Sequence, residues 1–273
     1  MDYAHISTFI DLMDSRSFNR TAGRLNITQS TVSHRIQALE KELNVALFSR
    51  SRGGTTPTPA GDRFLEHAHA LAQQWNTAKH HVELSKGFEK ALRIGFQHDL
   101  STHMWANTVG RLRQEFPDTR LNVELDYSLQ MNRDVLNGEL DLAVVYTQMP
   151  LPDLHFEHIG DVPYVLVSDR EISVETYIFP DISAQFSIDH RLKHPELTGA
   201  PITCGKSRGI MNMLQLQGGA SYLMIEDALK LCDENPEFQI APNAQINQAM
   251  YICVNLRHRH DHRVMRIKKI IKS

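Results

Sequence analysis

The helical spacing of apolar residues near the N-terminus constrains this sequence more than any other feature. The first run recurs at i, i+3, i+4 and i+7, which predicts an amphipathic helix over residues 3–14 with one buried stripe: Ile6, Phe9, Ile10 and Met13. Ser17 or Asn19 can cap a short second helix, and Thr28 can cap a third. The apolar residues of the third are again helically spaced: Val32, Ile36, Leu39 and Leu43. We therefore expect three short helices that share one core.

The other face of the third helix is rich in uncharged or titratable hydrogen-bonding side chains. Its members are Gln29, Ser30, Thr31, Ser33, His34, Arg35 and Gln37. A helix about 10–12 Å across fits the major groove of B-DNA, where Gln and Arg bind base edges and Ser or Thr bind bases or phosphates. This face predicts helix-turn-helix DNA binding. A small helical bundle with a polar surface is the alternative.

A glycine turn and two arginines follow the three helices. The run from Val45 to Phe48 and the Thr/Pro stretch to Pro59 flank Gly53-Gly54, which predicts a two-stranded wing. Arg50 and Arg52 are placed to bind phosphates or to enter the minor groove. Residues 16–63 carry eight basic and three acidic side chains, a local charge of +5, although the whole chain has a net charge of −3. This segment can bind a polyanion.

A long helix is predicted to begin at Pro59, with Thr58 as its cap, and to run to about Lys86. A narrow apolar seam lies along it: Phe64, Ala68, Leu71, Trp75, Ala78 and Val82. Such a seam is typical of a coiled coil and predicts a twofold homodimer that carries two recognition helices to an imperfect inverted repeat in double-stranded DNA. Packing of this helix on its own chain is the alternative.

The N-terminal residues resemble the winged helix-turn-helix of LysR-type transcriptional regulators over about sixty positions. The resemblance is carried by Phe9, Ser17-Phe18, Ala22, Leu25, Thr28-Gln29-Ser30, Val32-Ser33, Ile36, Leu39-Glu40, Leu43, Leu47-Phe48, Arg50 and Thr58-Pro59-Ala60-Gly61. The family often has proline where Ser30 stands and arginine where His34 stands. The resemblance implies a dimerising linker helix, a dimer of dimers (homotetramer) and RNA polymerase as a further partner.

From residue 91 the apolar pattern alternates between strand and helix spacing. Residues 92–145 read as β-α-β-α-β, which indicates a parallel sheet covered on both faces. Ligands bind such sheets at the carboxyl ends of the strands, which nominates three segments: Gln97 to Thr102, Tyr127 to Ser128 and Tyr146 to Gln148. A second α/β lobe is expected from Tyr164, and a strand at residues 250–254 with a following helix returns the chain to the first lobe.

This second half is similar to the effector domain of the same regulators, on the strings "LRIGF" and "GELDLAVVY" and the Gly-rich segment near Gly218. The resemblance implies an α/β, two-lobed, periplasmic-binding-protein-like domain, with Ser101 and Thr102 binding a small anionic effector and Ser207 facing them. The expected domains are a winged helix-turn-helix (1–58), a linker helix (59–90) and an effector domain (91–273), with lobe I at 91–161 and 246–273 and lobe II at 162–245.

The second lobe is shorter than in most of the family, as in the flagellar-operon repressor group, to which the chain is loosely similar. Two functions follow as expectations. The first is a transcriptional regulator modulated by a small molecule; the alternative is a ligand-independent LysR-type regulator with a vestigial cleft. A small-molecule binding module or an enzyme without DNA function is the third class, and a gel-shift assay separates these from the first two.

No enzyme, metal or membrane feature stands out. The sequence lacks G-x-S-x-G, P-loop and H-E-x-x-H motifs, which predicts a protein that is not an enzyme and has no cofactor; a hydrolase using Cys204 is the open alternative. The alternating His258, His260 and His262 suit a metal only if extended, and flanking arginines favour a solvated loop. Three scattered cysteines are expected to be reduced, with a Cys204 and Cys232 redox switch as the minor alternative. The longest apolar run is too short to span a bilayer, and the N-terminus lacks signal-peptide features, so we expect a cytoplasmic protein.

Overall fold

The computed structural model describes residues 2–51, 54–82, 88, 90–100 and 102–272. The chain divides into two compact units, which are described separately. The first comprises Met1–Lys86 with the short segment Leu136–Glu139, and the second comprises Gly87–Val135 and Leu140–Ser273.

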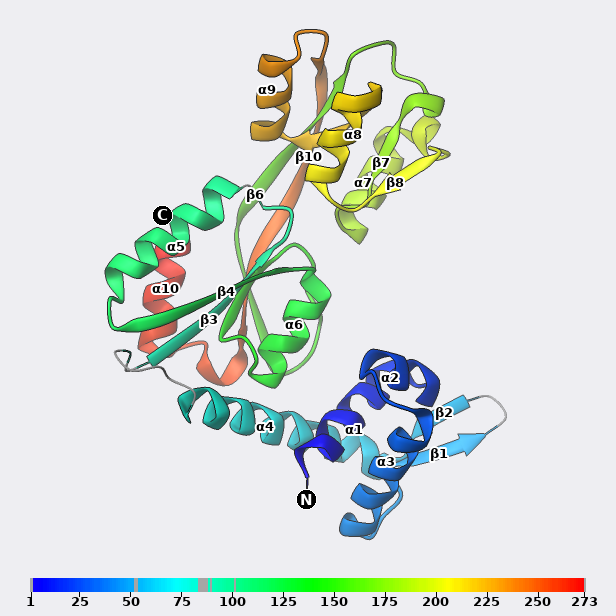
Figure 1. Ribbon diagram of the computed structural model, residues 1–273, viewed down its shortest axis with the longest axis vertical. Helices are drawn as coiled ribbons and strands as arrows, with labels where there is room; N and C mark the ends of the chain where they lie inside the picture. The colour runs from blue at the N-terminus through cyan, green and yellow to red at the C-terminus, as the bar shows by residue number, and fades with distance from the viewer. Residues whose placement is uncertain (1, 52–53, 83–87, 89, 101, 273) are drawn as a thin grey trace. The chain divides into compact units, whose positions relative to one another are not determined.

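The first unit is a winged helix-turn-helix with a long helix after it (Figure 1). Its elements are α1 (Tyr3–Ser15), α2 (Phe18–Arg24), α3 (Gln29–Leu43), β1 (Phe48–Ser51), β2 (Gly54–Pro57) and α4 (Pro59–Val82). The predicted caps are confirmed for two helices, because Ser17 accepts from the N–H of Arg20 and Thr28 accepts from the N–H of Thr31. The antiparallel pairing of β1 with β2 confirms the wing.

One apolar core joins the three short helices, as their spacing predicts. It contains Ile6, Phe9, Leu12, Met13, Phe18, Ala22, Val32, Ile36, Leu39, Leu47, Phe48, Ala68 and Ala72. The first turn of α4 reaches this core by a close approach at Gly61, where an added Cβ would lie 2.3 Å from the carbonyl oxygen of Leu47. Glycine at this position therefore lets α4 start directly beside the wing.

The linker seam is only partly as predicted. Ala68 is buried in the core of the first unit, and Phe64 packs against that core with its ring 5.1 Å from the Phe9 ring. These two residues therefore have packing partners within their own chain, and the dimer contact stays a prediction. Farther along α4, Leu71 is 40% exposed, Trp75 is 52% exposed and Val82 is 84% exposed.

The second unit contains a six-stranded mixed sheet in the order β4-β3-β5-β10-β6-β9. The predicted β-α-β-α-β unit is confirmed as β3 (Lys90–Gln97), α5 (Thr102–Glu115), β4 (Thr119–Asp126), α6 (Ser128–Asn137) and β5 (Leu142–Val145). Strand β3 pairs in parallel with β4 and with β5. Helices α5 and α10 (His262–Lys272) cover one face of these strands and α6 covers the other (Figure 1).

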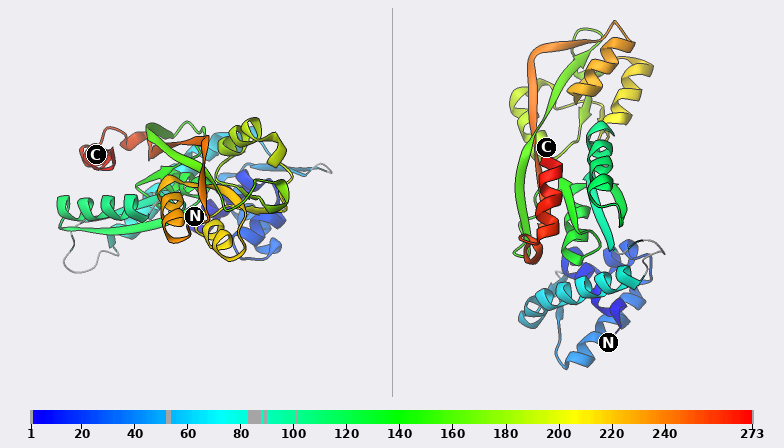
Figure 2. Two further views of the ribbon diagram at one scale, coloured as in Figure 1. Left: turned by 90° about the horizontal axis from the view of Figure 1, so that it is seen from above. Right: turned by 90° about the vertical axis from the view of Figure 1, so that its left-hand side faces the viewer.

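Two long strands, β6 (Leu154–Ser168) and β10 (Gln239–Asn255), pair antiparallel along the second unit and belong to both lobes (Figure 2). Strand β6 alternates between two cores, because Tyr164 and Leu166 join the large core while Val165 and Val167 join the core of lobe II. This explains the continuous apolar run at this point of the sequence. The lobe boundary expected at residues 161 and 246 lies inside these two strands.

Lobe II gathers at one end of β6 and β10 (Figure 1). Its other elements are the parallel pair β7 (Ile178–Pro180) and β8 (Ile202–Cys204), with α7 (Ala184–Lys193), α8 (Ser207–Gln217), β9 (Ala220–Met224) and α9 (Ile225–Glu234). The second α/β lobe is thus confirmed, and so is the return of the chain through β10 and α10 to lobe I.

Several smaller expectations can also be compared with the structure. The three cysteines form no disulfide in the structure, and burial raises the pKa of the Cys232 and Cys253 thiols, the opposite of what a sensor thiol needs. The histidine-rich segment is not extended, since a 3-10 turn covers Leu256–His258 and α10 starts at His262. Within the described ranges, no helix combines the length and apolarity needed to cross a membrane.

A buried histidine makes the stability of lobe II depend on pH. His190 is fully buried, its Nε2 lies 2.7 Å from the hydroxyl of Tyr177, and burial together with the nearby His194 lowers the pKa of His190 to about 4. The unfolded chain binds a proton near the ordinary value of 6.5 while the folded protein does not, so stability is lost as pH falls from about 6.5 towards 4.

We expect protonation of His190 in the unfolded chain to lower the unfolding free energy by about 2 kcal/mol between pH 7 and pH 5. Urea denaturation followed by circular dichroism at both pH values measures the loss. His190→Gln keeps a hydrogen-bonding group opposite Tyr177 but cannot be protonated, so its loss should be smaller by that amount. An equal loss in both proteins would contradict the assignment.

Candidate functional site

The outer face of α3 presents the polar side chains that the sequence singles out. Gln29, Ser30, His34 and Gln37 are exposed, while Thr31, Ser33 and Arg35 are partly buried. All seven lie on one helix of 15 residues that begins at Gln29. The structure therefore presents an exposed edge of hydrogen-bonding groups on a helix that is anchored by its apolar face.

Some of these side chains also have partners within the protein. The Thr28 hydroxyl lies 2.8 Å from the hydroxyls of both Ser30 and Thr31, which orders the first turn of α3. The Arg35 guanidinium donates to the hydroxyl of Thr8 on α1 at 3.2 Å. Arg35 thus joins α3 to α1, a role that sequence spacing alone does not reveal.

The basic charge of this unit is less available than the count of residues suggests. Arg24 forms ion pairs with Asp11 at 3.0 Å and Asp14 at 2.7 Å, and Arg20 donates to the carbonyl of Ser15. Arg50 lies opposite Thr55 in the wing, with its side chain outside the described part of the structure, as is all of Arg52. The phosphate contacts assigned to the wing arginines remain predictions.

Glu40 connects α3 to the wing. Its Oε1 accepts from the N–H of Leu47 at 2.7 Å and from the N–H of Phe48 at 3.1 Å, just where β1 begins. Two backbone donors at the buried start of a strand need an acceptor, and a carboxylate is a strong one. The Leu39-Glu40 pair of the sequence resemblance was the only signal for this contact.

In the second unit the carboxyl ends of three strands meet, as the topology predicts. The Ser128 hydroxyl donates to Oε1 of Gln97, at the end of β3, with an O···O distance of 2.5 Å. The same hydroxyl accepts from the N–H of Tyr146 at 2.9 Å and of Thr147 at 3.2 Å, both after β5. Ser128 and Tyr146 are therefore brought together, and Ser128 has hydrogen-bond partners inside the protein.

Two residues that follow β3, His98 and Asp99, belong to the segment from Gln97 to Thr102 that the sequence nominates, and both contact lobe II. The ring of His98 is tilted by 50° to the ring of Tyr127 with centroids 4.1 Å apart, and its Nε2 lies 2.9 Å from the carbonyl oxygen of Gly205 in lobe II. Asp99 Oδ1 accepts from the N–H of Ser207 at 2.8 Å. Ser207 lies where lobe II meets lobe I, and its described partner is Asp99. Ser101 and the side chain of Thr102 lie outside the described residues.

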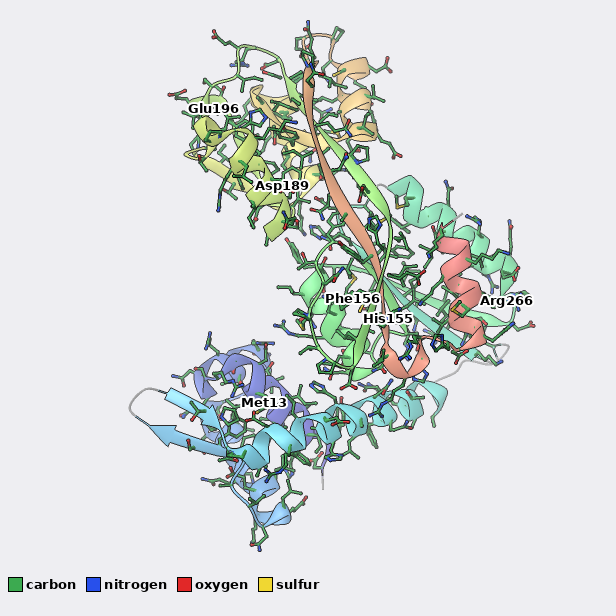
Figure 3. All side chains as sticks on the ribbon, turned by 180° about the vertical axis from the view of Figure 1, so that it is seen from behind. Met13, His155, Phe156, Asp189, Glu196 and Arg266 are labelled. Carbon is green, nitrogen blue, oxygen red and sulfur yellow. The ribbon has the colours of Figure 1, made fainter. Side chains whose placement is uncertain are left out.

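A separate hollow of about 290 Å³ lies at the other end of the lobe I sheet. Its lining residues are Lys90, Glu115, Phe116, Pro117, Asp118, Thr119, His262, Arg263 and Arg266. Arg266, labelled on α10 in Figure 3, pairs with Glu115 and lies over the ring of Phe116. The hollow adjoins the starts of β3 and β4, away from the carboxyl ends where ligands bind such sheets. Among the described residues, no group of three or more His, Cys, Asp or Glu side chains is arranged to hold a metal ion.

Comparison with known families agrees with this division of the chain. Residues 3–62 match the family described as "Bacterial regulatory helix-turn-helix protein, lysR family", and residues 85–178 match the family described as "LysR substrate binding domain". The second match covers the N-terminal part of lobe I and the start of lobe II and ends at β7.

Curated relatives are regulators by name. The chain is 27% identical over 172 residues to the HTH-type transcriptional regulator AlsR of Bacillus subtilis (strain 168), covering 63% of this chain and 57% of AlsR. It is 40% identical over 153 residues to the HTH-type transcriptional regulator HdfR of Yersinia enterocolitica, covering 56% of this chain and 52% of HdfR. The chain thus spans about half the length of the curated relatives it matches.

Solved structures share the fold over the whole chain. Full-length LysG from Corynebacterium glutamicum with bound effector Arg superposes with a TM-score of 0.56 at 17% identity, covering 100% of this chain and 97% of LysG. A full-length OxyR variant from Pseudomonas aeruginosa superposes with a TM-score of 0.58 at 17% identity, covering 100% of this chain and 95% of OxyR. At this identity the similarity shows a common fold.

The Glu40 anchor can be tested by its contribution to stability. Glu40→Ala should lower the unfolding free energy of the first unit by about 2 kcal/mol, because two backbone N–H groups lose their acceptor. Urea denaturation in a Trp105→Phe background, followed by Trp75 fluorescence, reports on this unit. Glu40→Gln keeps an acceptor oxygen and should lose less than half as much, and Lys41→Ala is an exposed control. A loss in Glu40→Ala no greater than in Lys41→Ala would refute the role of Glu40.

Proposed function

Because the chain belongs to the LysR family, we propose that it is a DNA-binding transcriptional regulator whose operator binding responds to its effector domain. The observation that carries this proposal is the exposed polar edge of α3 within a winged helix-turn-helix. The proposed partner is double-stranded DNA with an imperfect inverted repeat, which places the activity in the cytoplasm. The curated relatives are named as regulators, and we propose no catalytic activity for this chain.

In the proposed complex α3 lies in the major groove. Gln29 and Gln37 present amides that can bind adenine edges in pairs of hydrogen bonds, and Ser30 and His34 lie on the same exposed edge. Arg50 and Arg52, on the wing, are proposed to bind phosphates. Backbone contacts of this kind fix the position of the protein, while the contacts of α3 select the sequence.

The second half of α4 is the proposed dimer contact. Leu71, Trp75, Ala78 and Val82 are exposed in the single chain and lie on one stripe of the helix. Burying such a stripe against a second copy removes apolar surface from water and sets two recognition helices on a twofold axis. A dimer of dimers is the further assembly proposed from the family, with RNA polymerase as a partner of the bound complex.

The effector domain is proposed to bind a small molecule between its lobes, near Tyr127, Ser128, Tyr146 and Ser207. Two lobes joined by long strands can change their relative angle, and a ligand that prefers one angle shifts that population. Ser101 and Thr102 belong to the same proposal on sequence grounds. The second candidate, a regulator that needs no ligand, is favoured by the hydrogen bonds that Ser128 and Ser207 already form inside the protein.

DNA binding is tested by fluorescence anisotropy on the region upstream of the protein's own gene and on a random duplex. Affinity for both should fall steeply as salt rises, because bound phosphates release counterions. Gln29→Ala should lower discrimination between the two duplexes by about 5- to 150-fold, which corresponds to roughly 1–3 kcal/mol. Arg50→Ala should instead weaken both complexes alike and reduce the salt slope by about one.

Gln74→Ala is the matched control, because it removes the same amide from an exposed position on α4. It should change neither the discrimination nor the salt slope. Salt-independent binding by the wild type, or an equal loss on both duplexes for Gln29→Ala, would count against the proposed recognition face.

The dimer contact is tested by Trp75→Glu. A charge within an apolar seam must be buried without a partner or must force the helices apart, so the variant should sediment as a monomer and bind operator DNA more weakly. Sedimentation velocity checks the first point. Gln74→Glu adds the same charge at the neighbouring exposed position and should remain dimeric. If Trp75→Glu and Leu71→Glu both stay dimeric, the contact lies elsewhere.

A further inference from the structure

The two lobes are joined by hydrogen bonds that involve residues more than one hundred positions apart. The segment after β3 in lobe I supplies His98 and Asp99, and the turn before α8 in lobe II supplies Gly205 and Ser207. His98 Nε2 lies 2.9 Å from the Gly205 carbonyl oxygen, and Asp99 Oδ1 lies 2.8 Å from the Ser207 nitrogen. Both contacts lie at the carboxyl end of β3, the edge where this class of sheet binds ligands.

Asp99 reaches the start of a helix that does not cap itself. Helix α8 has 11 residues, Ser207 is its first residue, and Lys206 at the N-cap position provides no side-chain cap. The first N–H groups of a helix lack partners within the helix and attract negative charge. A lysine side chain has no acceptor atom, so the carboxyl of Asp99 supplies from the other lobe what a local cap usually supplies.

The surroundings differ from those of an ordinary helix cap. Asp99 is 5% exposed and Ser207 is 3% exposed, and neither Oδ2 of Asp99 nor the hydroxyl of Ser207 has a hydrogen-bond partner within the described part of the chain. A capping carboxylate on a surface remains hydrated, whereas burial without full hydrogen bonding costs free energy. The unpartnered Ser207 hydroxyl can donate to a second oxygen beside the one that the Ser207 N–H binds, so the start of α8 suits an anion with more than one acceptor.

Electrostatics place Asp99 inside one buried polar cluster. Burial raises the pKa of Asp99, whereas the Ser207 N–H, His98, the Ser207 hydroxyl and Lys206 act to lower it. The Ser207 hydroxyl is near enough to act on Asp99, but the two side chains do not meet hydrogen-bond geometry. Tyr146 and Tyr164 belong to the same cluster, with hydroxyl oxygens 3.4 Å apart. Burial raises the pKa of both phenols, and the charge of Asp99 raises each further.

We propose that the Asp99 carboxylate takes the place of an effector anion. Asp99 occupies the start of α8 and joins the two lobes in the absence of any ligand. This inference rests on the proposed function, because it concerns the cleft in which an effector would bind. The start of α8 is therefore the position from which the Asp99 side chain excludes a small carboxylate in the native protein. The Asp99 contact also gives a physical basis for regulation without an anionic effector, since the contact such a ligand would make between the lobes is already present.

The test is chemical complementation of the full-length chain with formate. Asp99→Ala removes the carboxyl and leaves the Ser207 N–H and hydroxyl facing a space the size of a small carboxylate. At constant ionic strength, replacing chloride by 100 mM formate should raise the Tm of Asp99→Ala by about 2–4 °C, as expected for a weak ligand that binds only the folded state. The Tm of the wild type should not respond, because its own carboxyl fills the site.

Two variants serve as controls. Asp99→Asn keeps the side-chain volume and an acceptor oxygen for Ser207, so it should ignore formate. Asp227→Ala removes a different, partly buried carboxyl on α9 of lobe II and should gain no formate response. If Asp99→Ala does not fold in chloride, it is refolded in formate, and recovery in formate alone supports the proposal.

Three results would overturn the proposal. They are a formate response of the wild type or of Asp99→Asn equal to that of Asp99→Ala, no response in any of the proteins, and failure of Asp99→Ala to fold in either salt while Asp99→Asn folds normally. None of these measurements uses DNA, so a failure of DNA binding leaves this result standing. Conversely, a missing formate response leaves the DNA-binding result unaffected.

Discussion

The antiparallel pairing of β6 with β10 holds the effector domain together. The pairing runs from Gln239 opposite Ser168 to Asn255 opposite Leu154, so one ladder passes through both lobes. The register shifts between Met250 and Tyr251, where Gly160 on the partner strand has a φ of 140° that suits only glycine. Such a bulge increases the local twist, and it lies close to the point where lobe I gives way to lobe II. The relative orientation of the lobes therefore depends on a few backbone positions and on the contacts that bridge the cleft.

The interlobe contacts have different chemistry from the core. Tyr164 and Leu166 extend one apolar core across both lobes, and such contacts tolerate small adjustments because they have no preferred direction. The hydrogen bonds from His98 and Asp99 require a particular alignment of lobe II. A regulator needs two arrangements of similar free energy, and a bridging carboxylate can select one of them at a cost that ligand binding can reverse. The contacts of His98 and Asp99 therefore restrict the alignment of lobe II more than the apolar core does.

The N-terminal unit depends on a different type of constraint, namely the fixing of short helices by their ends. Thr28 caps α3, Glu40 ties the last turns of α3 to the wing, and Gly61 lets α4 start against Leu47. Each of these residues acts on backbone groups that the helices and the wing leave unsatisfied or crowded. Together they hold the polar edge of α3 as a rigid surface, which direct reading of a DNA sequence requires.

The sequence by itself determined the local elements and their order. Periodic apolar residues such as Ile6, Phe9 and Met13, caps such as Ser17 and Thr28, and the alternating run of β3 act over a few residues, so their pattern predicts helices, wing and strands directly. The exposed face of α3 and the meeting of Ser128 with Tyr146 followed from the same patterns and from the topology of a parallel sheet. Only the tertiary structure decided that Phe64 and Ala68 pack within their own domain, that Arg35 binds Thr8, and that Asp99 meets Ser207. These outcomes depend on which surfaces meet after the chain has folded, and no local spacing encodes a contact between residues 108 positions apart.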